Sequence, residues 1–83
     1  MKIEYLAKIR DAMGCPSETV DLPHGVTTAS DLLVWLAARN DRSASAFLDR
    51  ANIHVALDDR IANRGDELAG VQTVTLFPPV TGG

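Results

Sequence analysis

The chain has little of what secreted, membrane-bound and nucleic-acid-binding proteins usually need. Its single cysteine, Cys15, has no partner for an internal disulfide, which is typical of a protein in a reducing compartment. No apolar run approaches the roughly 20 residues that a membrane-spanning helix requires. Charged residues appear within the first four positions, so a signal peptide is not expected. These absences together predict a cytoplasmic protein.

Basic charge is also scarce. The chain has 8 lysines and arginines against 11 acidic residues, which gives a formal net charge of −3. A nucleic-acid-binding domain normally presents a basic patch, so no nucleic-acid partner is expected. The sequence has no internal repeat, low-complexity tract or linker, and its 83 residues, 46% of them hydrophobic, fit one small domain.

The side chains that usually carry catalysis are not grouped in any familiar pattern. His24 and His54 have no cysteine or carboxylate at the spacing of a metal site or a catalytic triad, so both are interpreted as solvated. Cys15 lies in a predicted loop, where it is either a reactive thiol or, as we favour, an ordinary one. No glycine-rich phosphate-binding loop is present, so ATP chemistry would belong to a partner. We expect no metal ion and no bound cofactor.

The hydrophobic pattern predicts strands towards both ends of the chain and one main helix between them. Alternation of apolar and polar residues predicts strands over residues 2–10, 17–22, 53–58, 60–62 and 71–77. Thr28 is the predicted N-cap of the helix, which should end near residue 40. A short helical turn over residues 43–48 is expected to seat Phe47 and Leu48 on the core.

Two strands, a helix and a return to strands is the order of a ubiquitin-like β-grasp fold. This fold is of the α+β class, and here it would be a mixed sheet of four to five strands covered on one face by one main helix plus a short helical turn. We expect it to occupy residues 1–77. The predicted core consists of apolar residues from most of these elements: Ile3, Tyr5, Val20, Leu22, Leu32, Leu33, Leu36, Val55, Leu57, Leu68, Val74 and Leu76.

Alternation along the last strand gives the first indication of a functional surface. If Val74 and Leu76 point into the core, Phe77 points to the other face of the sheet. An exposed aromatic side chain there suggests a docking surface, and the alternative is that Phe77 folds back as ordinary core. Pro78 and Pro79 lack the backbone N–H that a strand ladder needs, so they should lead the chain away from the sheet.

Residues 78–83 are predicted to form a flexible C-terminal tail that ends in Gly-Gly. It can reach roughly 20 Å at about 3.3 Å per residue. Gly82 and Gly83 have no side chain, so the tail can pass through a narrow channel. With side-chain catalysis not expected, the reactive group that remains is the terminal carboxylate of Gly83.

The ending Phe-Pro-Pro-Val-Thr-Gly-Gly closely resembles that of the small, sulfur-carrying subunits of molybdopterin synthases, which are ubiquitin-like β-grasp proteins. The resemblance implies that a ubiquitin-activating-like adenylyltransferase uses ATP to adenylate Gly83, and that a sulfur donor then converts it to a thiocarboxylate. The large catalytic subunit would use that sulfur to build the dithiolene of molybdopterin from cyclic pyranopterin monophosphate. The chain would have no activity alone and would work within a heterotetramer.

The resemblance also implies which residues contact the large subunit. Arg10, at the end of the first predicted strand, and Ile61, near the fourth, match interface positions of the family. The tail and the residue before it would supply the other contacts: Phe77, Pro78, Pro79, Val80 and Thr81. The segment 70–72 departs from the acidic turn that the family often has before its last strand.

Two alternative functions stay open. In the first alternative, the chain carries sulfur for another pathway, thiamine synthesis or tRNA thiolation. The Phe-Pro-Pro-Val-Thr segment before its glycines differs, however, from that of the thiamine type. Alternatively, it is a non-catalytic ubiquitin-like interaction or conjugation module, whose Gly-Gly is incidental or is joined to protein lysines.

Overall fold

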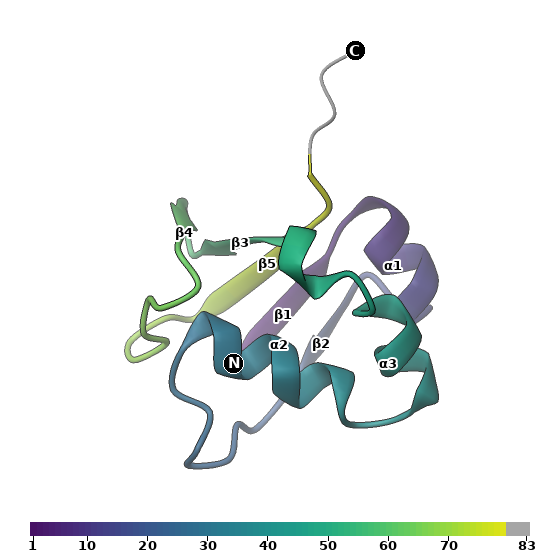
Figure 1. The fold of residues 1–83 in the computed structure, drawn as a ribbon. Coiled ribbons are helices and arrows are strands. Elements are labelled where there is room, and N and C mark those ends of the chain that lie inside the picture. Colours follow the sequence, from purple (N-terminus) through teal and green to yellow (C-terminus); the bar gives the residue numbers. More distant parts are fainter. Residues whose placement is uncertain (80–83) are drawn as a thin grey trace.

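Five short strands form one mixed sheet in the computed structural model, which describes residues 1–79 (Figure 1). The strand order is β2-β1-β5-β3-β4, with β1 and β5 parallel and the other neighbouring pairs antiparallel. The strands are β1 (Lys2–Tyr5), β2 (Ser17–Thr19), β3 (His54–Leu57), β4 (Arg60–Ala62) and β5 (Thr73–Phe77). The first and last strands are central and parallel, so the predicted β-grasp fold is confirmed.

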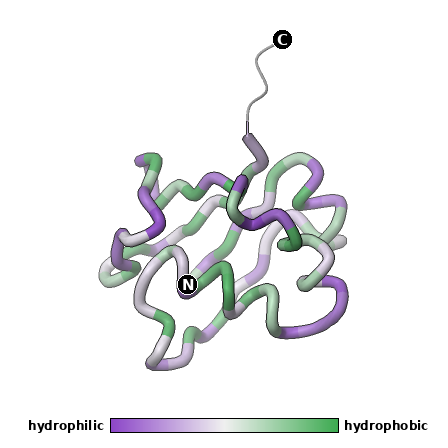
Figure 2. The backbone as a smooth tube through the Cα atoms, in the orientation of Figure 1, coloured by the Kyte–Doolittle hydropathy of each residue, from purple (hydrophilic) through white to green (hydrophobic). Residues whose placement is uncertain are grey.

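The helices pack their apolar residues into a single core with the sheet. They are α1 (Ala7–Met13), α2 (Ala29–Ala37) and α3 (Asp41–Ala46), whereas the 3₁₀ turn η1 (Arg50–Asn52) after α3 has no buried residue. Hydrophilic residues gather in the connection between α2 and α3 (Figure 2). Within residues 1–79, no helix has the length and apolar character needed to cross a membrane.

The predicted start of the main helix is confirmed. The Thr28 hydroxyl accepts a hydrogen bond from the Asp31 N–H (3.2 Å), and the Asp31 carboxylate accepts one from the Thr28 N–H (3.2 Å). This reciprocal pair is a capping box, which satisfies N–H groups that have no partner inside the helix. Asp31 also accepts from the Thr27 N–H, and these backbone hydrogen bonds lower the pKa of its carboxyl.

The predicted first strand is wrong beyond residue 5. Ala7 has a φ of 52°, in the left-handed region, and this turn takes the chain out of the sheet and into α1. Ile9 and Met13 lie four residues apart on the buried side of α1. Gly14 ends the helix with a φ of 79°, a conformation that costs glycine little. The first two strands are therefore joined by a helix and not by a simple loop.

The predicted core is confirmed except at Leu22, which is half-buried because β2 ends at Thr19. The prediction that Phe47 and Leu48 both pack on the core is confirmed for Phe47 and wrong for Leu48. Phe47, the C-cap of α3, is fully buried, whereas Leu48, which lies beyond the helix, is 80% exposed.

Candidate functional site

The tail begins at the centre of the sheet. β5 lies between β1 and β3 and ends at Phe77, and Pro78 and Pro79 follow outside any strand, as the absence of their N–H predicts. The Leu6 N–H donates to the Leu76 carbonyl (3.0 Å), so β1 accompanies β5 almost to its last residue. The chain therefore leaves the fold from a strand that is paired on both sides.

The residues predicted to carry the chemistry lie outside the described residues. These are the catalytic Gly82 and Gly83, together with the predicted contact residues Val80 and Thr81. Their roles stay predictions.

Phe77 points away from the core, as its place in the alternation predicts. Its neighbours Val74 and Leu76 are completely buried, whereas Phe77 is half-buried. Its ring stacks on that of His54, which is the paired residue of β3, with 5.5 Å between ring centroids and 20° between planes. Phe77 is therefore not core, and its role in binding a partner stays a prediction.

Ile61 lies on the same side of the sheet as Phe77. It pairs with Ala56, which in turn pairs with Thr75, so these three side chains form one row across three strands. Ile61 is 68% exposed and Leu6, which continues the outward positions of β1, is 44% exposed. We call this side, which faces away from α2, the open face.

Arg10 is not on a strand as predicted but on the exposed side of α1. Helix α1 and strand β4 lie at opposite sides of the sheet (Figure 1), so the structure does not bring Arg10 and Ile61 together. Phe77 at the end of the central strand lies between them in strand order. An interface that used both residues would therefore have to span the sheet.

His54 is the residue that sequence reasoning missed. Alternation places both His54 and Phe77 on the outer face, but only the register of β3 against β5 makes them neighbours. Register depends on pairing between segments far apart in the sequence, so the only available signal was that both residues are outward aromatic rings.

The clearest charge network in the structure lies away from the tail. The Arg39 guanidinium donates two hydrogen bonds to the Glu18 carboxylate, each 2.9 Å long, and the Tyr5 hydroxyl donates a third of 2.6 Å. The hydrogen bonds from Arg39 hold the pKa of Glu18 below its usual range, and burial raises the pKa of Tyr5. The Arg39 guanidinium also lies 5.2 Å from the centre of the Trp35 ring. This network joins β1, β2 and the end of α2.

The remaining candidate side chains stay apart from one another. Cys15 is half-buried and packs against the core, and His24 is exposed in a turn. Among residues 1–79, no three histidine, cysteine or acidic side chains are close enough together to hold a metal ion.

Comparison with solved structures gives several matches over the whole length of the chain. SAMP1 from Haloferax volcanii is 26% identical and superposes with a TM-score of 0.73, covering 100% of this chain and 98% of that one. Another structure of H. volcanii small archaeal modifier protein 1 is 25% identical over 96% and 97% of the two chains, with a TM-score of 0.73.

A third structure is a putative molybdopterin converting factor, subunit 1, from Pyrococcus furiosus. It is 24% identical over 95% of each chain, with a TM-score of 0.70, and at this identity the likeness shows the fold alone. No curated protein matches the chain. The model of the ThiS family, however, matches residues 3–83. Because this match spans nearly the whole sequence, the chain belongs to the ThiS family of ubiquitin-like sulfur carriers.

Proposed function

We propose that this chain is the sulfur-carrier subunit of a molybdopterin synthase. The observation that carries the proposal is the Phe-Pro-Pro-Val-Thr-Gly-Gly ending, which continues the central strand β5 directly. The name of the P. furiosus structure is in keeping with this function. Membership of the ThiS family supports the more general role of a sulfur carrier.

The proposed chemistry takes place at the Gly83 carboxylate. A carboxylate resists nucleophilic attack at neutral pH because its oxygen is a poor leaving group. An adenylyltransferase partner would transfer AMP from ATP to this oxygen and release pyrophosphate. A sulfur nucleophile would then attack the carbonyl carbon and expel AMP, which leaves a thiocarboxylate. In the synthase, that sulfur would attack cyclic pyranopterin monophosphate, and repeated transfer would build the dithiolene.

Residues 1–79 would position the start of the tail and would supply apolar surface that binds the partner. Since β5 is held on both sides, the tail starts from a fixed place relative to any partner on the open face. Pro78 and Pro79 reduce the conformational freedom that the tail loses when it enters a channel. Phe77 and Ile61 offer apolar surface to the large catalytic subunit, whose own side chains would supply the acid and base groups.

A second candidate function is conjugation to other proteins. The likeness to SAMP1, at 26% identity over the whole chain, favours it, because the second H. volcanii structure is named a modifier protein. Both functions activate the same Gly83 carboxylate, and they differ in whether sulfur or a lysine amine attacks it. A third possibility, a carrier for thiamine synthesis or tRNA thiolation, shares the sulfur step and differs in the acceptor.

The mass of the intact protein from its native host separates these functions. A carrier is expected to show a species in which one C-terminal oxygen is replaced by sulfur. A conjugation module is expected instead in covalent adducts with other proteins, with no sulfur-containing form. The purified thiocarboxylate should then support molybdopterin formation with the large subunit and cyclic pyranopterin monophosphate. Failure with that acceptor, but transfer to a thiazole-forming or tRNA-thiolating enzyme, would overturn the molybdopterin assignment.

A further inference from the structure

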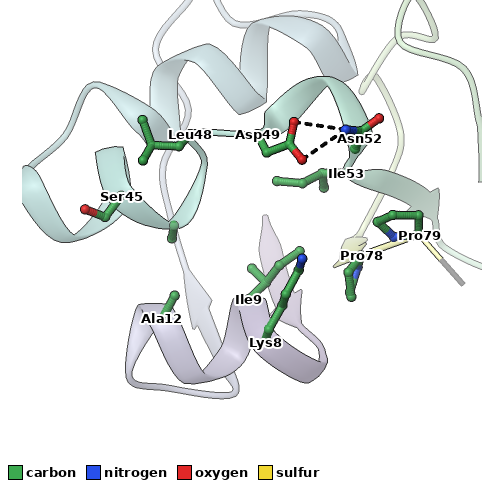
Figure 3. A pocket seen from close by; sticks show the side chains of 11 residues that line it. Lys8, Ile9, Ala12, Ser45, Leu48, Asp49, Asn52, Ile53, Pro78 and Pro79 are labelled. Atoms are coloured by element: carbon green, nitrogen blue, oxygen red, sulfur yellow. Dashed lines mark hydrogen bonds between the residues drawn. The ribbon is translucent and has the colours of Figure 1, made fainter. Parts of the chain in front are cut away.

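Two hollows in the surface meet at Pro79, the last residue that the structure describes. One lies on the side of α1, and its lining includes Lys8 and Asp49 (Figure 3). The other has a volume of about 220 Å³ and is lined by residues of η1, of the start of β3 and of the end of β4. Pro79 and Asn52 line both hollows. The chain therefore leaves the fold between two hollows that differ in their charged residues.

The hollow between η1 and β4, which we call the edge hollow, has a basic lining. Arg64 and His54 line it, and among the described residues no aspartate or glutamate does. Within residues 1–79, Arg64 forms no ion pair. The Asp49 carboxylate lines the other hollow, where it accepts two hydrogen bonds from the Asn52 side-chain amide (3.0 and 2.9 Å; Figure 3). The edge hollow therefore favours an anionic group, although the chain as a whole has a net charge of −3.

Backbone carbonyls hold the Arg64 guanidinium in place. Its Nη2 group donates to the Ile53 carbonyl (2.7 Å) and to the Arg50 carbonyl, so one nitrogen links the two ends of η1. Both hydrogen bonds leave from this nitrogen, so neither of them occupies Nη1 or Nε. An arginine that is already oriented loses less side-chain freedom when it binds a carboxylate than a freely rotating one does.

The length of chain beyond Pro79 determines what must come close to the edge hollow. Four residues follow Pro79, and four residues span at most about 13 Å at roughly 3.3 Å per residue. An enzyme that adenylates the Gly83 carboxylate must therefore bring its active site within about that distance of Pro79. Adenylation is also the step that the carrier and conjugation functions share. The surface beside Pro79 is thus the part of the domain that such an enzyme has to approach.

We propose that Arg64 binds a carboxylate side chain of the adenylyltransferase, next to the point where the tail leaves the domain. An aspartate or glutamate of the enzyme would accept hydrogen bonds from the guanidinium and offset its charge. Charge pairs in an interface set orientation and association rate more than affinity, so Arg64 would orient the domain on the enzyme. The proposal rests on the proposed function only in requiring that an adenylyltransferase acts on Gly83, which conjugation requires as well.

Affinity for the adenylyltransferase, measured by titration calorimetry without ATP, tests the proposal. Arg64→Gln should raise the dissociation constant about tenfold at about 0.1 M salt, where the Debye length is about 10 Å. The difference from the wild type should nearly disappear at about 1 M salt, where the Debye length is about 3 Å.

Arg60→Gln is the matched control, because it removes the same charge from the same edge of the sheet. Arg60 is the first residue of β4, whereas Arg64 follows the last, and Arg60 already pairs with Asp66 at 3.2 Å. This variant should leave the dissociation constant unchanged.

A charge exchange separates a contact with the enzyme from the structural role that Arg64 has beside η1. Arg64→Glu should weaken binding more than Arg64→Gln, because the new carboxylate repels the one on the enzyme. Each aspartate and glutamate around the entrance to the enzyme's active site is then changed to arginine in turn. One of these changes should restore the affinity of Arg64→Glu and weaken binding of the wild type. Damage to η1 could not be repaired by a change in the other protein.

Equal affinity of the wild type and Arg64→Gln would overturn the proposal. A loss of binding in Arg64→Glu that no enzyme variant restores would also overturn it, because Arg64 would then act only through η1. Sulfur loading of Gly83, measured by mass, tests the proposed function separately. A chain that docks through Arg64 and never carries sulfur would refute the sulfur-carrier function alone. A loaded chain whose docking ignores Arg64 would refute the contact alone.

Discussion

Phe77 and Leu76 are adjacent in β5 but face opposite sides of the sheet, which makes them a matched pair for mutation. Phe77→Ala removes a half-buried ring from the open face and should weaken binding to the large catalytic subunit by about 1–4 kcal/mol, with little loss of stability. Leu76→Ala removes a fully buried side chain and should lower the free energy of unfolding by about 2–5 kcal/mol.

Titration calorimetry with the large subunit and thermal unfolding measure the two effects. If Phe77→Ala lowered the melting temperature as much as Leu76→Ala, and left the affinity unchanged, Phe77 would be part of the core and not of a docking surface. His54→Ala tests whether the stacked ring is needed to hold Phe77, and it should weaken binding less than Phe77→Ala.

Glu18 makes stability depend on pH. Its pKa is lower in the folded protein than in the unfolded chain because Arg39 donates hydrogen bonds to the carboxylate. Its contribution is therefore complete above the unfolded value of about 4.3, and is lost as the pH falls through the folded value. Glu18→Gln should lower the free energy of unfolding by about 1–3 kcal/mol at pH 7 and by little at strongly acidic pH. The free energy of unfolding of this variant should therefore fall less on acidification than that of the wild type.

Urea unfolding at a series of pH values measures this effect, and Glu4→Gln is its control. Glu4 pairs with Lys2 at 3.4 Å on an exposed surface, where such a pair contributes about 0–1 kcal/mol. Equal losses at pH 7 from both variants would show that the hydrogen bonds from Arg39 contribute nothing specific. Asp31 and Asp66 also have lowered pKa values in the folded state, so some acid sensitivity should remain in Glu18→Gln.

Among the elements, helix α1 is the one that the sequence pattern hides. Ile3, Tyr5, Ala7 and Ile9 alternate with polar residues, which favours one long strand. The break occurs at Ala7, whose φ of 52° is rare for any residue other than glycine, so residue type gives no warning of it. Burial of Ile9 on the core stabilises the turn against local preference, and the helix is only 7 residues long.

Ala7→Gly should therefore stabilise the protein. An L-residue with left-handed φ costs about 1–2 kcal/mol, which glycine avoids, while the added backbone freedom of the unfolded chain offsets part of the gain. A net increase of up to about 1 kcal/mol in unfolding free energy is expected. Ala12→Gly, at an exposed position of the same helix, should instead lose about 0.5–1 kcal/mol. Urea unfolding of both variants measures the difference, and losses of similar size would contradict a strained Ala7.

At the scale of the whole molecule, the order of the strands and the main helix along the chain and the face of each strand could be predicted. Helix α1 and the order in which the strands pair across the sheet could not. Alternation placed Phe77 outward and Val74 inward, because each depends only on residues next to it. The contact of Phe77 with His54, and the distance between Arg10 and Ile61, depend on which strands pair and in what register. Strand pairing and register follow from packing of the complete core. Helix α1 contributes residues to that core which the sequence pattern assigned to a strand or a loop.

In the proposed function, docking and chemistry belong to different parts of the chain, which leads to a prediction about mixtures of two proteins. Ile61 is on the edge strand β4, whereas Gly83 is the last residue of the tail. Deleting Gly83 should leave the domain and its open face intact but abolish sulfur transfer. An excess of this truncated protein should then inhibit molybdopterin formation by the wild-type carrier, because it occupies the large subunit without delivering sulfur.

Adding Ile61→Asp to the truncated protein should relieve that inhibition. Ile61 is 68% exposed, so the substitution should cost the free domain little stability, but it would place a charge in the proposed apolar contact with the large subunit. The measurement is the rate of molybdopterin formation at a fixed wild-type concentration and increasing amounts of each truncated variant. Equal inhibition by both would mean that Ile61 lies outside the interface. No inhibition by either would mean that binding depends on Gly83 itself, so that the tail and not the open face carries the affinity.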